Sequence, residues 1–364
     1  MTVSVAVVGA GAVGLTAAYD LAEAGADVTV FERETVGAGS SGRAAGVLYD
    51  AYSDAVDARI ADRALDRFRA FSGRGDFAFH ETPYVQFATD AERADVIEET
   101  VFHLQAQDRD VSVISRDDLE REFPHVDWSD VEGAMVARNA GYADPATYPA
   151  LLADLARERG VDVRERTPAE LTLDPTAVNG DPFDAVAVAA GAHTKQVLAD
   201  AGLSVPLKPY RVQALVATGP PVPMFHDATA GYYARPHPQG ILAGDGTEPR
   251  EFDPDDWNRE GDGWFEARTL AALRERLRGD ISLHRSWAGL CVATPDGDPL
   301  LGELADGVYV AAGWQGHGFM RAPATGEALA DAVLGRDGID VAPFDPARFD
   351  GDESFAIREG MDIG

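Results

Sequence analysis

The hydrophobic pattern at the start of the chain predicts a β-α-β unit. Residues 3–8 form a mostly apolar, β-branched run, which is typical of a strand buried on both faces. A helical stretch follows from Ala12 to about Ala24, where Gly25 supplies the stop. Residues 27–32 then predict a second strand.

Helical and strand patterns continue to alternate along the chain. Ser53 is predicted to cap a long helix, Ser115 resembles another helix start, and Asp144 and Pro145 suit a cap and a first helical position. Pro323 is predicted to open the last helix. Helices are expected over residues 53–71, 92–107, 144–160, 254–278 and 323–334, and strands over residues 77–87, 184–189, 205–218, 231–244, 281–292 and 308–312.

These patterns predict a mixed α/β and α+β protein with two discontinuous domains. Segments with the nucleotide-binding pattern occur at the start, middle and end of the chain, and we expect them to form one Rossmann-like domain from residues 1–76, 141–207 and 284–364. The intervening residues 77–140 and 208–283 have a more antiparallel pattern. We expect these to form an inserted substrate-binding domain.

Composition changes this picture mainly through charge. The 364 residues include 62 Asp and Glu but only 31 Lys and Arg, which gives a formal net charge of -31. Such a surface repels nucleic acid and anionic membranes. A generally acidic cytosolic protein is one interpretation. We favour a halophilic source, because self-repulsion is tolerable where molar salt shortens the Debye length to about 3 Å.

The remaining composition favours a cytoplasmic protein that is not integral to a membrane. Cys291 is the single cysteine, so no intramolecular disulfide can form. No basic stretch precedes the apolar N-terminal residues, as a signal peptide would require, and the uncharged run of residues 3–19 is too short for a membrane span. The histidines show no metal-ligand spacing, so no metal site is expected.

The motif Gly9-Ala-Gly11-Ala-Val-Gly14 lies between the first strand and the first helix. Gly9 would allow the tight turn, Gly11 the approach of a pyrophosphate, and Gly14 the packing of helix on strand. Glu32 ends the second strand, where its carboxylate can bind a ribose diol and would repel the 2′-phosphate of NADP. In this setting the motif predicts a dinucleotide site and leaves FAD and NAD as alternatives.

Six segments, spread over nearly the whole chain and in the same order, resemble the FAD-dependent D-amino acid oxidase superfamily. Its sarcosine oxidase, glycine oxidase and D-amino acid dehydrogenase branches are the most similar. The segments are VAVVGAGAVGLTAAYDLAEAGADVTVFER, GAGSSGRAAGV, YADPATYPALLADLARERGVDV, DAVAVAAGAHT, SWAGLCVATPDGDPLLGEL and GVYVAAGWQGHGFMRAPATGEALAD. NAD dehydrogenases do not share this order, so the resemblance implies FAD as the cofactor.

The resemblance also implies which residues contact FAD. Gly9, Gly11 and Gly14 would meet the pyrophosphate, Glu32 the adenosine ribose, and Arg33 the adenine. Contacts nearer the flavin or the adenine-side phosphates would come from Ser40, Ser41, Arg43, Ala45, Gly46, Gly191, Gly313, Gly316, His317, Gly318, Phe319 and Met320. For Ser40 and Ser41 ordinary loop chemistry is the alternative, and for His317 a structural role.

The family's chemistry removes a hydride from the carbon beside an amine and delivers it to flavin N5, and the imine then hydrolyses. Because the cofactor performs the difficult step, no catalytic triad or metal cluster is needed. The resemblance implies a small amino acid or amine as substrate. The electron acceptor, O2 or a carrier or dye, stays open.

The chain departs from the family at the substrate end. Cys291 stands where glycine oxidase-like members have a carboxylate-binding arginine, and Met320 stands where sarcosine oxidase-like members have a lysine. The candidate replacements are Arg43, Arg211, Arg235 and Arg321, with Arg211 on a strand that reaches the substrate pocket in the family. An ion pair in this acidic chain is the alternative for Arg211, and the side chain of Arg321 is expected to point elsewhere.

Tyr232 and Tyr233 match an aromatic position over the substrate, and Tyr233 is the candidate. Strand neighbours face opposite sides, so one of the two should pack in the core. Cys291 lies two residues from a position that binds FAD covalently in sarcosine oxidase-like members, and a buried structural thiol is the favoured interpretation.

Three functions stay open from the sequence. The first is C–N oxidation of an amino acid or secondary amine. The second is FAD-dependent oxidation of a 2-hydroxy acid or polyol phosphate. The third is a catalytically silent FAD-binding subunit, which the absent carboxylate anchors at Cys291 and Met320 keep open.

Overall fold

A six-stranded sheet forms one half of the molecule in this computed structural model, which describes residues 2–358. The strand order is β19-β20-β13-β1-β2-β9, and every neighbouring pair except β19/β20 is parallel. The strands are β1 Ser4–Val8, β2 Asp27–Phe31, β9 Asp162–Arg164, β13 Ala185–Val188, β19 Leu300–Ala305 and β20 Val308–Ala312. The predicted β-α-β start is confirmed, because β1 and β2 are parallel neighbours joined through a helix.

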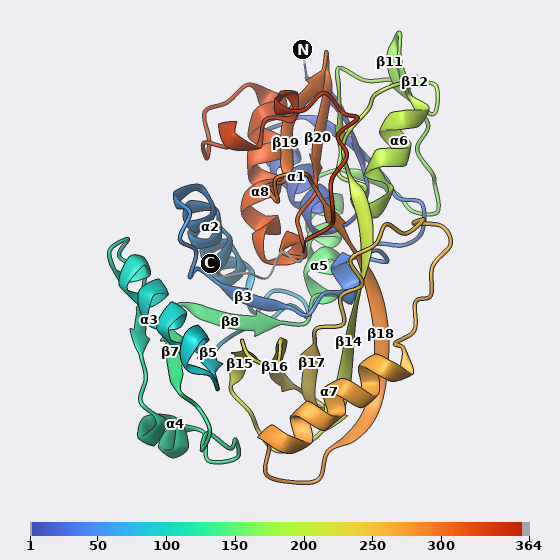
Figure 1. The fold of residues 1–364 in the computed structure, drawn as a ribbon. Coiled ribbons are helices and arrows are strands. Elements are labelled where there is room, and N and C mark those ends of the chain that lie inside the picture. The colour runs from blue at the N-terminus through green and yellow to red at the C-terminus, as the bar shows by residue number, and fades with distance from the viewer. Residues whose placement is uncertain (1, 359–364) are drawn as a thin grey trace.

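Helices from distant parts of the sequence pack beside this sheet (Figure 1). They are α1 Ala12–Glu23, α2 Ala55–Phe71, α5 Thr147–Glu158, α6 Thr194–Asp200 and α8 Gly318–Leu334. α1 and α8 approach closely at Gly326, where an added Cβ would lie 2.4 Å from Cβ of Thr16. A residue without a side chain therefore sets the distance between these two helices.

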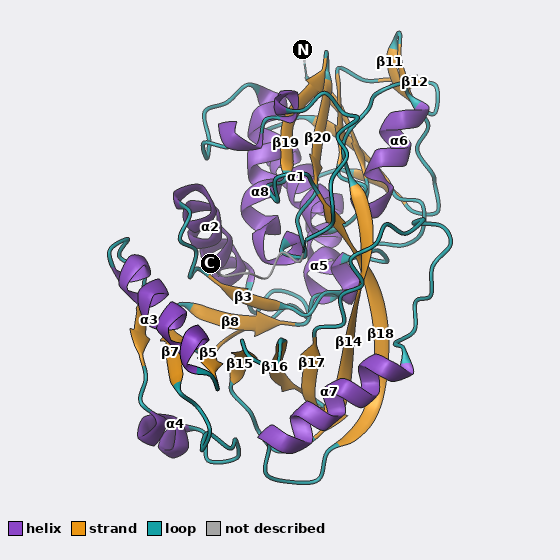
Figure 2. Cartoon of the chain, in the orientation of Figure 1, coloured by secondary structure: helices purple, strands orange, loops and turns teal. Residues whose placement is uncertain are grey.

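An eight-stranded sheet, mostly antiparallel, forms the other half, with only β15 and β5 parallel. Its order is β18-β14-β17-β16-β15-β5-β7-β6. The strands are β5 Tyr84–Ala88, β6 Val111–Val113, β7 Gly133–Ala137, β14 Lys208–Thr218, β15 Met224–Asp227, β16 Tyr232–His237, β17 Gly240–Gly244 and β18 Ser282–Ala293. Helices α3 Ala91–Gln105, α4 Arg116–Glu122 and α7 Gly263–Arg276 lie in this half (Figures 1 and 2).

Two small sheets complete the fold. One has the order β3-β8-β4 and is built from Val47–Tyr49, Ala140–Ala143 and Phe79–Glu81, and β3 and β8 lie between the two large sheets in Figure 1. The other joins β10 Leu171–Leu173, β11 Thr176–Val178 and β12 Asp181–Pro182. The glycine- and serine-rich loop of residues 37–46 leads directly into β3, so this small sheet fixes the position of the end of the loop.

Several helix starts differ from the sequence prediction. The cap of α2 is Asp54 instead of Ser53, because the Asp54 carboxylate accepts hydrogen bonds from the amides of Val56 and Asp57. α5 starts at Thr147, after the turn at Asp144 and Pro145. Ser115 caps α4 as predicted.

Three longer elements were predicted in kind but differ in their bounds. α8 starts at Gly318 instead of Pro323, which lies inside the helix. Pro323 is the sixth residue of α8, so the helix lacks the hydrogen bond that an amide at this position would donate to the carbonyl oxygen of Phe319. Residues 254–262 are loop instead of helix, and α7 begins only at Gly263. The predicted strand 77–87 is divided into β4 and β5.

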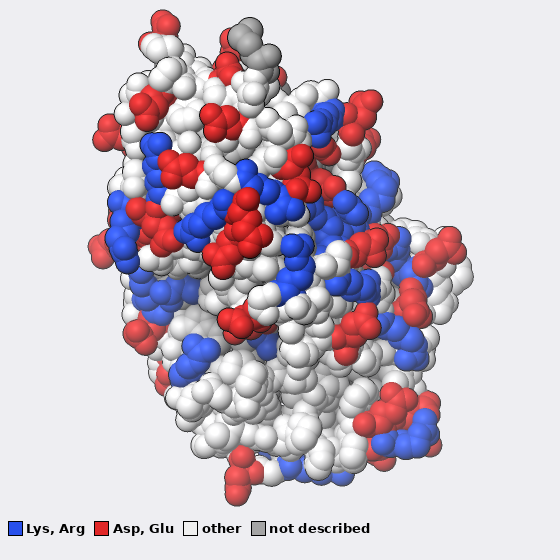
Figure 3. Space-filling model, turned by 180° about the vertical axis from the view of Figure 1, so that it is seen from behind, with Lys and Arg blue, Asp and Glu red and all other residues white. Residues whose placement is uncertain are grey.

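Acidic and basic side chains are mixed on the surface (Figure 3), although acidic residues are in excess. On the face in Figure 3, blue basic side chains lie beside red carboxylates over much of the visible surface. Many are paired, as at Arg63 and Glu327 (2.7 Å) and at Arg164 and Asp162 (2.7 Å). Within the described residues, no helix has both the length and the apolar character needed to cross a membrane.

Candidate active site

A cavity of about 530 Å³ opens at the carboxyl ends of the parallel strands. Its wall includes the segments that follow β1, β2, β13 and β20, together with residues of β14, β16 and β18 from the larger sheet. Crevices at this edge of a parallel sheet are the usual place for nucleotides. The cavity therefore brings together both halves of the fold.

The first glycines of the dinucleotide motif are required by close packing. Gly9 has φ +108°, and a Cβ there would lie 2.5 Å from the carbonyl oxygen of Ala189. A Cβ at Gly14 would lie 2.1 Å from the carbonyl oxygen of Gly9, so Gly14 lets α1 pack on the turn. Gly9 and Gly11 line the cavity and Gly14 does not.

Glu32 is held in the cavity wall by two backbone amides. Its Oε2 accepts from the amide of Ala10 (2.9 Å) and its Oε1 from the amide of Glu34 (2.8 Å). Each carboxylate oxygen has a second lone pair, so the group can still accept hydrogen bonds from a ribose diol. The chain thus orients the carboxylate in advance.

The two serines of the second glycine-rich loop have distinct partners. Ser41 Oγ accepts from the amide of Ala12 (2.9 Å), at the N-terminus of α1. Ser40 Oγ donates to the carbonyl oxygen of Leu290 (2.5 Å), which ties the loop to β18. Both line the cavity, at the helix end that favours an anion.

The structure brings most of the predicted site residues into this one cavity. Gly14, Gly313 and the candidate arginines Arg211, Arg235 and Arg321 do not line it. A Cβ at Gly313 would instead lie 2.4 Å from Cγ2 of Thr294. The predicted residues that line the cavity are Gly9, Gly11, Glu32, Arg33, Ser40, Ser41, Arg43, Ala45, Gly46, Gly191, Tyr233, Gly316, His317, Gly318, Phe319 and Met320.

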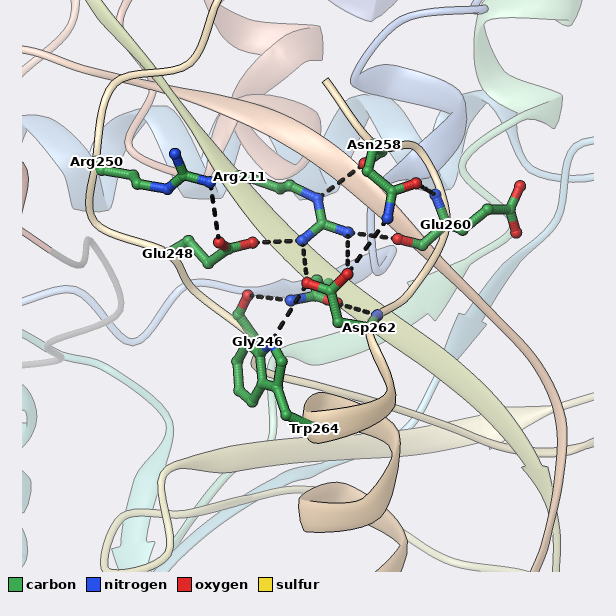
Figure 4. A network of polar contacts seen from close by, with 9 residues as sticks. Arg211, Gly246, Glu248, Arg250, Asn258, Glu260, Asp262 and Trp264 are labelled. Atoms are coloured by element: carbon green, nitrogen blue, oxygen red, sulfur yellow. Dashed lines mark hydrogen bonds and ion pairs between the residues drawn. The ribbon is translucent and has the colours of Figure 1, made fainter. Parts of the chain in front are cut away.

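Arg211 is committed to a buried ion-pair network (Figure 4). Its guanidinium pairs with Asp262 (2.5 Å) and with Glu248, and its Nε donates to the carbonyl oxygen of Asn258 (2.8 Å). Another nitrogen donates to the carbonyl oxygen of Glu260. The side chain is 3% exposed. This geometry matches the ion-pair alternative and not the carboxylate anchor.

The other candidate arginines outside the cavity lining are also engaged. Arg235 donates from Nε to the carbonyl oxygen of Ala45 (2.5 Å), and burial lowers the pKa of Arg235 to about 10. Arg321 is buried and pairs with Asp57 (2.9 Å), so it points away from the cavity as expected.

Arg43 is the candidate arginine that lines the cavity. It donates from one guanidinium nitrogen to the carbonyl oxygen of Ala288 (3.2 Å) and lies against the Trp257 ring (5.9 Å to the centroid). Burial lowers the pKa of Arg43, and repulsion by the nearby Arg259 lowers it further. Both causes disfavour the charged form of Arg43, whereas an anion bound beside it would favour that form.

The two neighbouring tyrosines divide as predicted. Tyr232 packs in the core of the larger half, edge-on to Phe225 (5.8 Å between ring centroids). Tyr233 lines the cavity. Its ring lies across Gly244, where an added Cβ would be 2.4 Å from the tyrosine oxygen. Alternation along β16 places the two rings on opposite faces.

His317 is a buried, neutral histidine in the cavity wall. Burial and the nearby Arg321 lower its pKa to about 3. Arg321 lies 3.5 Å from Nδ1 and can only donate, so Nδ1 is the acceptor and the proton of the neutral ring is on Nε2. Nε2 is buried without a hydrogen-bond partner in the described part of the chain.

Cys291 and Met320 both line the cavity at the flavin-side segments. An added Cβ at Gly316 would lie 3.7 Å from the Cys291 sulfur, and Met320 Sδ accepts from the Tyr52 hydroxyl (3.0 Å). Neither residue supplies a positive charge. The structure thus offers no direct replacement for the family's anchors at these two positions.

The sequence prediction missed one wall of the cavity. Pro254, Asp255, Trp257 and Arg259 line it, although residues 254–278 were assigned to a helix. The turn-forming run DPDDWNREGDG was the available signal, since Asp, Asn, Pro and Gly favour loops. Among the described residues, no group of three or more His, Cys, Asp or Glu side chains could hold a metal ion.

Comparison with known proteins identifies the family. Residues 4–332 match the family model for "FAD dependent oxidoreductase", and the chain belongs to this family. The cofactor is therefore FAD, and the glycine cradle, Glu32 and the continuous cavity fit it.

Relatives and solved structures agree with this assignment. Glycine oxidase from Geobacillus kaustophilus is 28% identical over 94% of this chain and 96% of its own. The 4-methylaminobutanoate oxidase of Paenarthrobacter nicotinovorans is also 28% identical, over 96% of this chain, which spans about half (46%) of that relative. The L-proline dehydrogenase of P. horikoshii has a TM-score of 0.85 at 27% identity, covering 96% and 98% of the two chains.

The pKa of His317 gives a direct test of the cavity wall. Because that pKa is about 3, we expect the imidazole to stay neutral from pH 8 down to pH 4.5. NMR of protein labelled with 15N at histidine should show no titration of this ring over that pH range. His317→Gln assigns the signal. A midpoint above 5 would contradict the buried, cation-flanked geometry.

Proposed function

We propose that this FAD-dependent oxidoreductase oxidises the C–N bond of an amino acid or a secondary amine. The observation that supports the proposal most directly is one cavity that is lined by Gly9 and Gly11 of the dinucleotide motif and also by Tyr233, Cys291 and the segment 316–320. Glycine oxidase and 4-methylaminobutanoate oxidase, whose names specify amine substrates, resemble the chain over more than nine-tenths of its length.

The chain's own residues bind and orient FAD in this proposal. Gly9 and Gly11 leave room for the pyrophosphate, the N-terminus of α1 offers amides to it, and Glu32 holds the ribose. FAD, when bound, supplies the acceptor for the hydride that leaves the carbon beside the amine. The predicted two-domain division remains part of the proposal, and the boundary at residue 284 falls inside β18.

His317 and Tyr233 are proposed to position the substrate at the flavin end. A ring with a pKa of about 3 is a weak proton acceptor at neutral pH, so His317 is not assigned as a general base. Instead, His317 contributes an uncharged imidazole ring to the cavity wall. Tyr233 contributes an aromatic wall whose place depends on the absence of a side chain at Gly244.

Arg43 is proposed to bind the substrate carboxylate in place of the anchors lost at Cys291 and Met320. It is the one of the four candidate arginines that lines the cavity, and no carboxylate among the described residues is paired with its guanidinium. Arg211 and Arg321, by contrast, are paired with carboxylates.

Substrate class can be tested by anaerobic bleaching of the yellow FAD-loaded protein. We expect amino acids or secondary amines to bleach the flavin absorbance and 2-hydroxy acids and polyol phosphates to leave it unchanged. Bleaching by hydroxy acids alone would support the second function, and no bleaching by any compound would support a silent subunit. Reoxidation by O2 or by an added dye then identifies the electron acceptor.

Arg43→Gln tests the anchor. We expect the KM for an amino acid that bleaches the flavin to rise about 10- to 100-fold, the loss typical of a charged hydrogen bond. The KM for the matching amine, which has no carboxylate, should change little. The FAD content measured by absorbance is the control for cofactor binding. Equal KM increases for the two substrates would contradict carboxylate binding by Arg43.

The net charge of -31 leads us to propose a halophilic, cytoplasmic protein. Screening of the acidic surface should make the folded state more stable as KCl rises from 0.1 to 2 M. Thermal unfolding followed by circular dichroism should therefore show a rising midpoint. A midpoint that is constant or falls over this range would contradict a salt-adapted surface.

A further inference from the structure

The segment 246–262, which we call the strap, connects β17 to α7 without helix or regular strand (Figure 2). Arg211 fixes its two ends together, because this one side chain pairs with Glu248 near the start and with Asp262 at the end. It also donates to the carbonyl oxygen of Asn258 (Figure 4). The base of the strap is thus held by a buried cation.

The outer part of the strap is fastened to the other half of the molecule by exposed ion pairs. Asp255 Oδ1 accepts from Arg33 (2.7 Å) and lies 3.2 Å from Nε2 of His193. Glu251 pairs with Lys195 of α6 (2.9 Å). Arg33 follows β2, so these contacts join the strap to the nucleotide-binding sheet. Arg33 and Asp255 are 42% and 44% exposed.

The strap passes over the adenosine side of the cavity. Arg33 lies next to Glu32, and both line the cavity together with His193. Residues of the strap supply the facing wall, namely Thr247, Pro254, Asp255, Trp257 and Arg259. Arg259 adds a third fastening to Glu34 (3.3 Å), and its guanidinium lies 5.6 Å from the Trp257 ring centroid.

We propose that the strap is a clasp that retains FAD, with Trp257 and Arg259 as additional cofactor contacts. FAD enters and leaves when the ion pairs of Asp255, Glu251 and Arg259 open, while Arg211 keeps the base in place. Trp257 offers an apolar ring and Arg259 a cation, which suits the adenosine and pyrophosphate portions of a dinucleotide. The inference concerns cofactor retention and is independent of which substrate is oxidised.

The strengths of the two fastenings explain why only the outer part would open. Exposed ion pairs contribute little stability and weaken as salt rises. The Arg211 network is buried, and breaking it would leave an uncompensated charge inside the protein. The strap therefore has a firm base and a weak, salt-sensitive outer edge.

The test measures FAD release by the rise in flavin fluorescence after dilution, in 0.1 to 2 M KCl. All proteins carry Cys291→Ser, so that this thiol cannot form a covalent bond to FAD and prevent its release. We expect Asp255→Asn with Glu251→Gln to release FAD about tenfold faster at 0.1 M KCl, the change expected for losing two exposed ion pairs. The acceleration of release by salt should shrink in this variant.

Asp154→Asn with Asp181→Asn is the matched control, because it removes two carboxylates of exposed ion pairs outside the cavity lining. Arg33→Gln opens the Asp255 pair from the other side and should also accelerate release. Arg259→Gln should raise the Kd for FAD severalfold, measured by fluorescence quenching on titration. Unfolding midpoints of the apoproteins should match the control.

Release rates equal to those of the control in both the double variant and Arg33→Gln would overturn the clasp. An unchanged Kd in Arg259→Gln would overturn the cofactor contact. These outcomes are distinct from a failure of the proposed amine oxidation, because neither measurement requires turnover.

Discussion

The fold depends on a backbone crossing that has no room for a side chain. Where β1 turns into α1, Gly9 lies against the carbonyl of Ala189, which follows β13, and Gly14 lies against Gly9 itself. A methyl group at either position would overlap backbone atoms, which cannot move aside as a flexible side chain can. This crossing brings the N-terminus of α1 to the carboxyl edge of the sheet, and the cavity begins there.

Because acidic residues outnumber basic ones, most arginines have a carboxylate or carbonyl oxygen available as a partner. In a chain with twice as many acidic as basic residues, most arginines near the cavity are already engaged by carboxylates or carbonyl oxygens. Arg211 organises the strap, Arg235 holds Ala45 in the cavity wall, and Arg321 lies beside Nδ1 of the buried His317. Arg43 is thereby left as the candidate with capacity for an anionic ligand.

The two ends of the cavity are built by different means. In our proposal the adenosine of FAD lies between the sheet edge with Glu32 and the strap, whose outer ion pairs are exposed. In the same proposal the flavin lies near Tyr233, His317 and Met320, which line the cavity and are uncharged. Selectivity for a substrate there has to come from shape, from neutral hydrogen bonds and from Arg43.

Local pattern was sufficient for β1, β2, β13 and β20 of the six-stranded sheet, since the apolar runs at residues 3–8 and 184–189 are typical of strands buried on both faces, whereas β19 was not predicted. The local pattern was misread at the starts of α7 and α8, although the turn-forming residues 253–263 already favour a loop. Pro323 is tolerated inside α8, and residues 254–262 are held as a loop by Arg211 and Arg33, which are remote in sequence.

By itself the sequence predicted a dinucleotide site from the glycine spacing and Glu32, and the resemblance of six segments in order implied FAD, which the family match confirms. The tertiary structure alone decided the role of each arginine. Nothing near Arg211 in the sequence indicates Asp262, and nothing near Arg321 indicates Asp57. An arginine's function depends on which carboxylate the fold brings to it, and that partner is chosen by packing over long sequence distances.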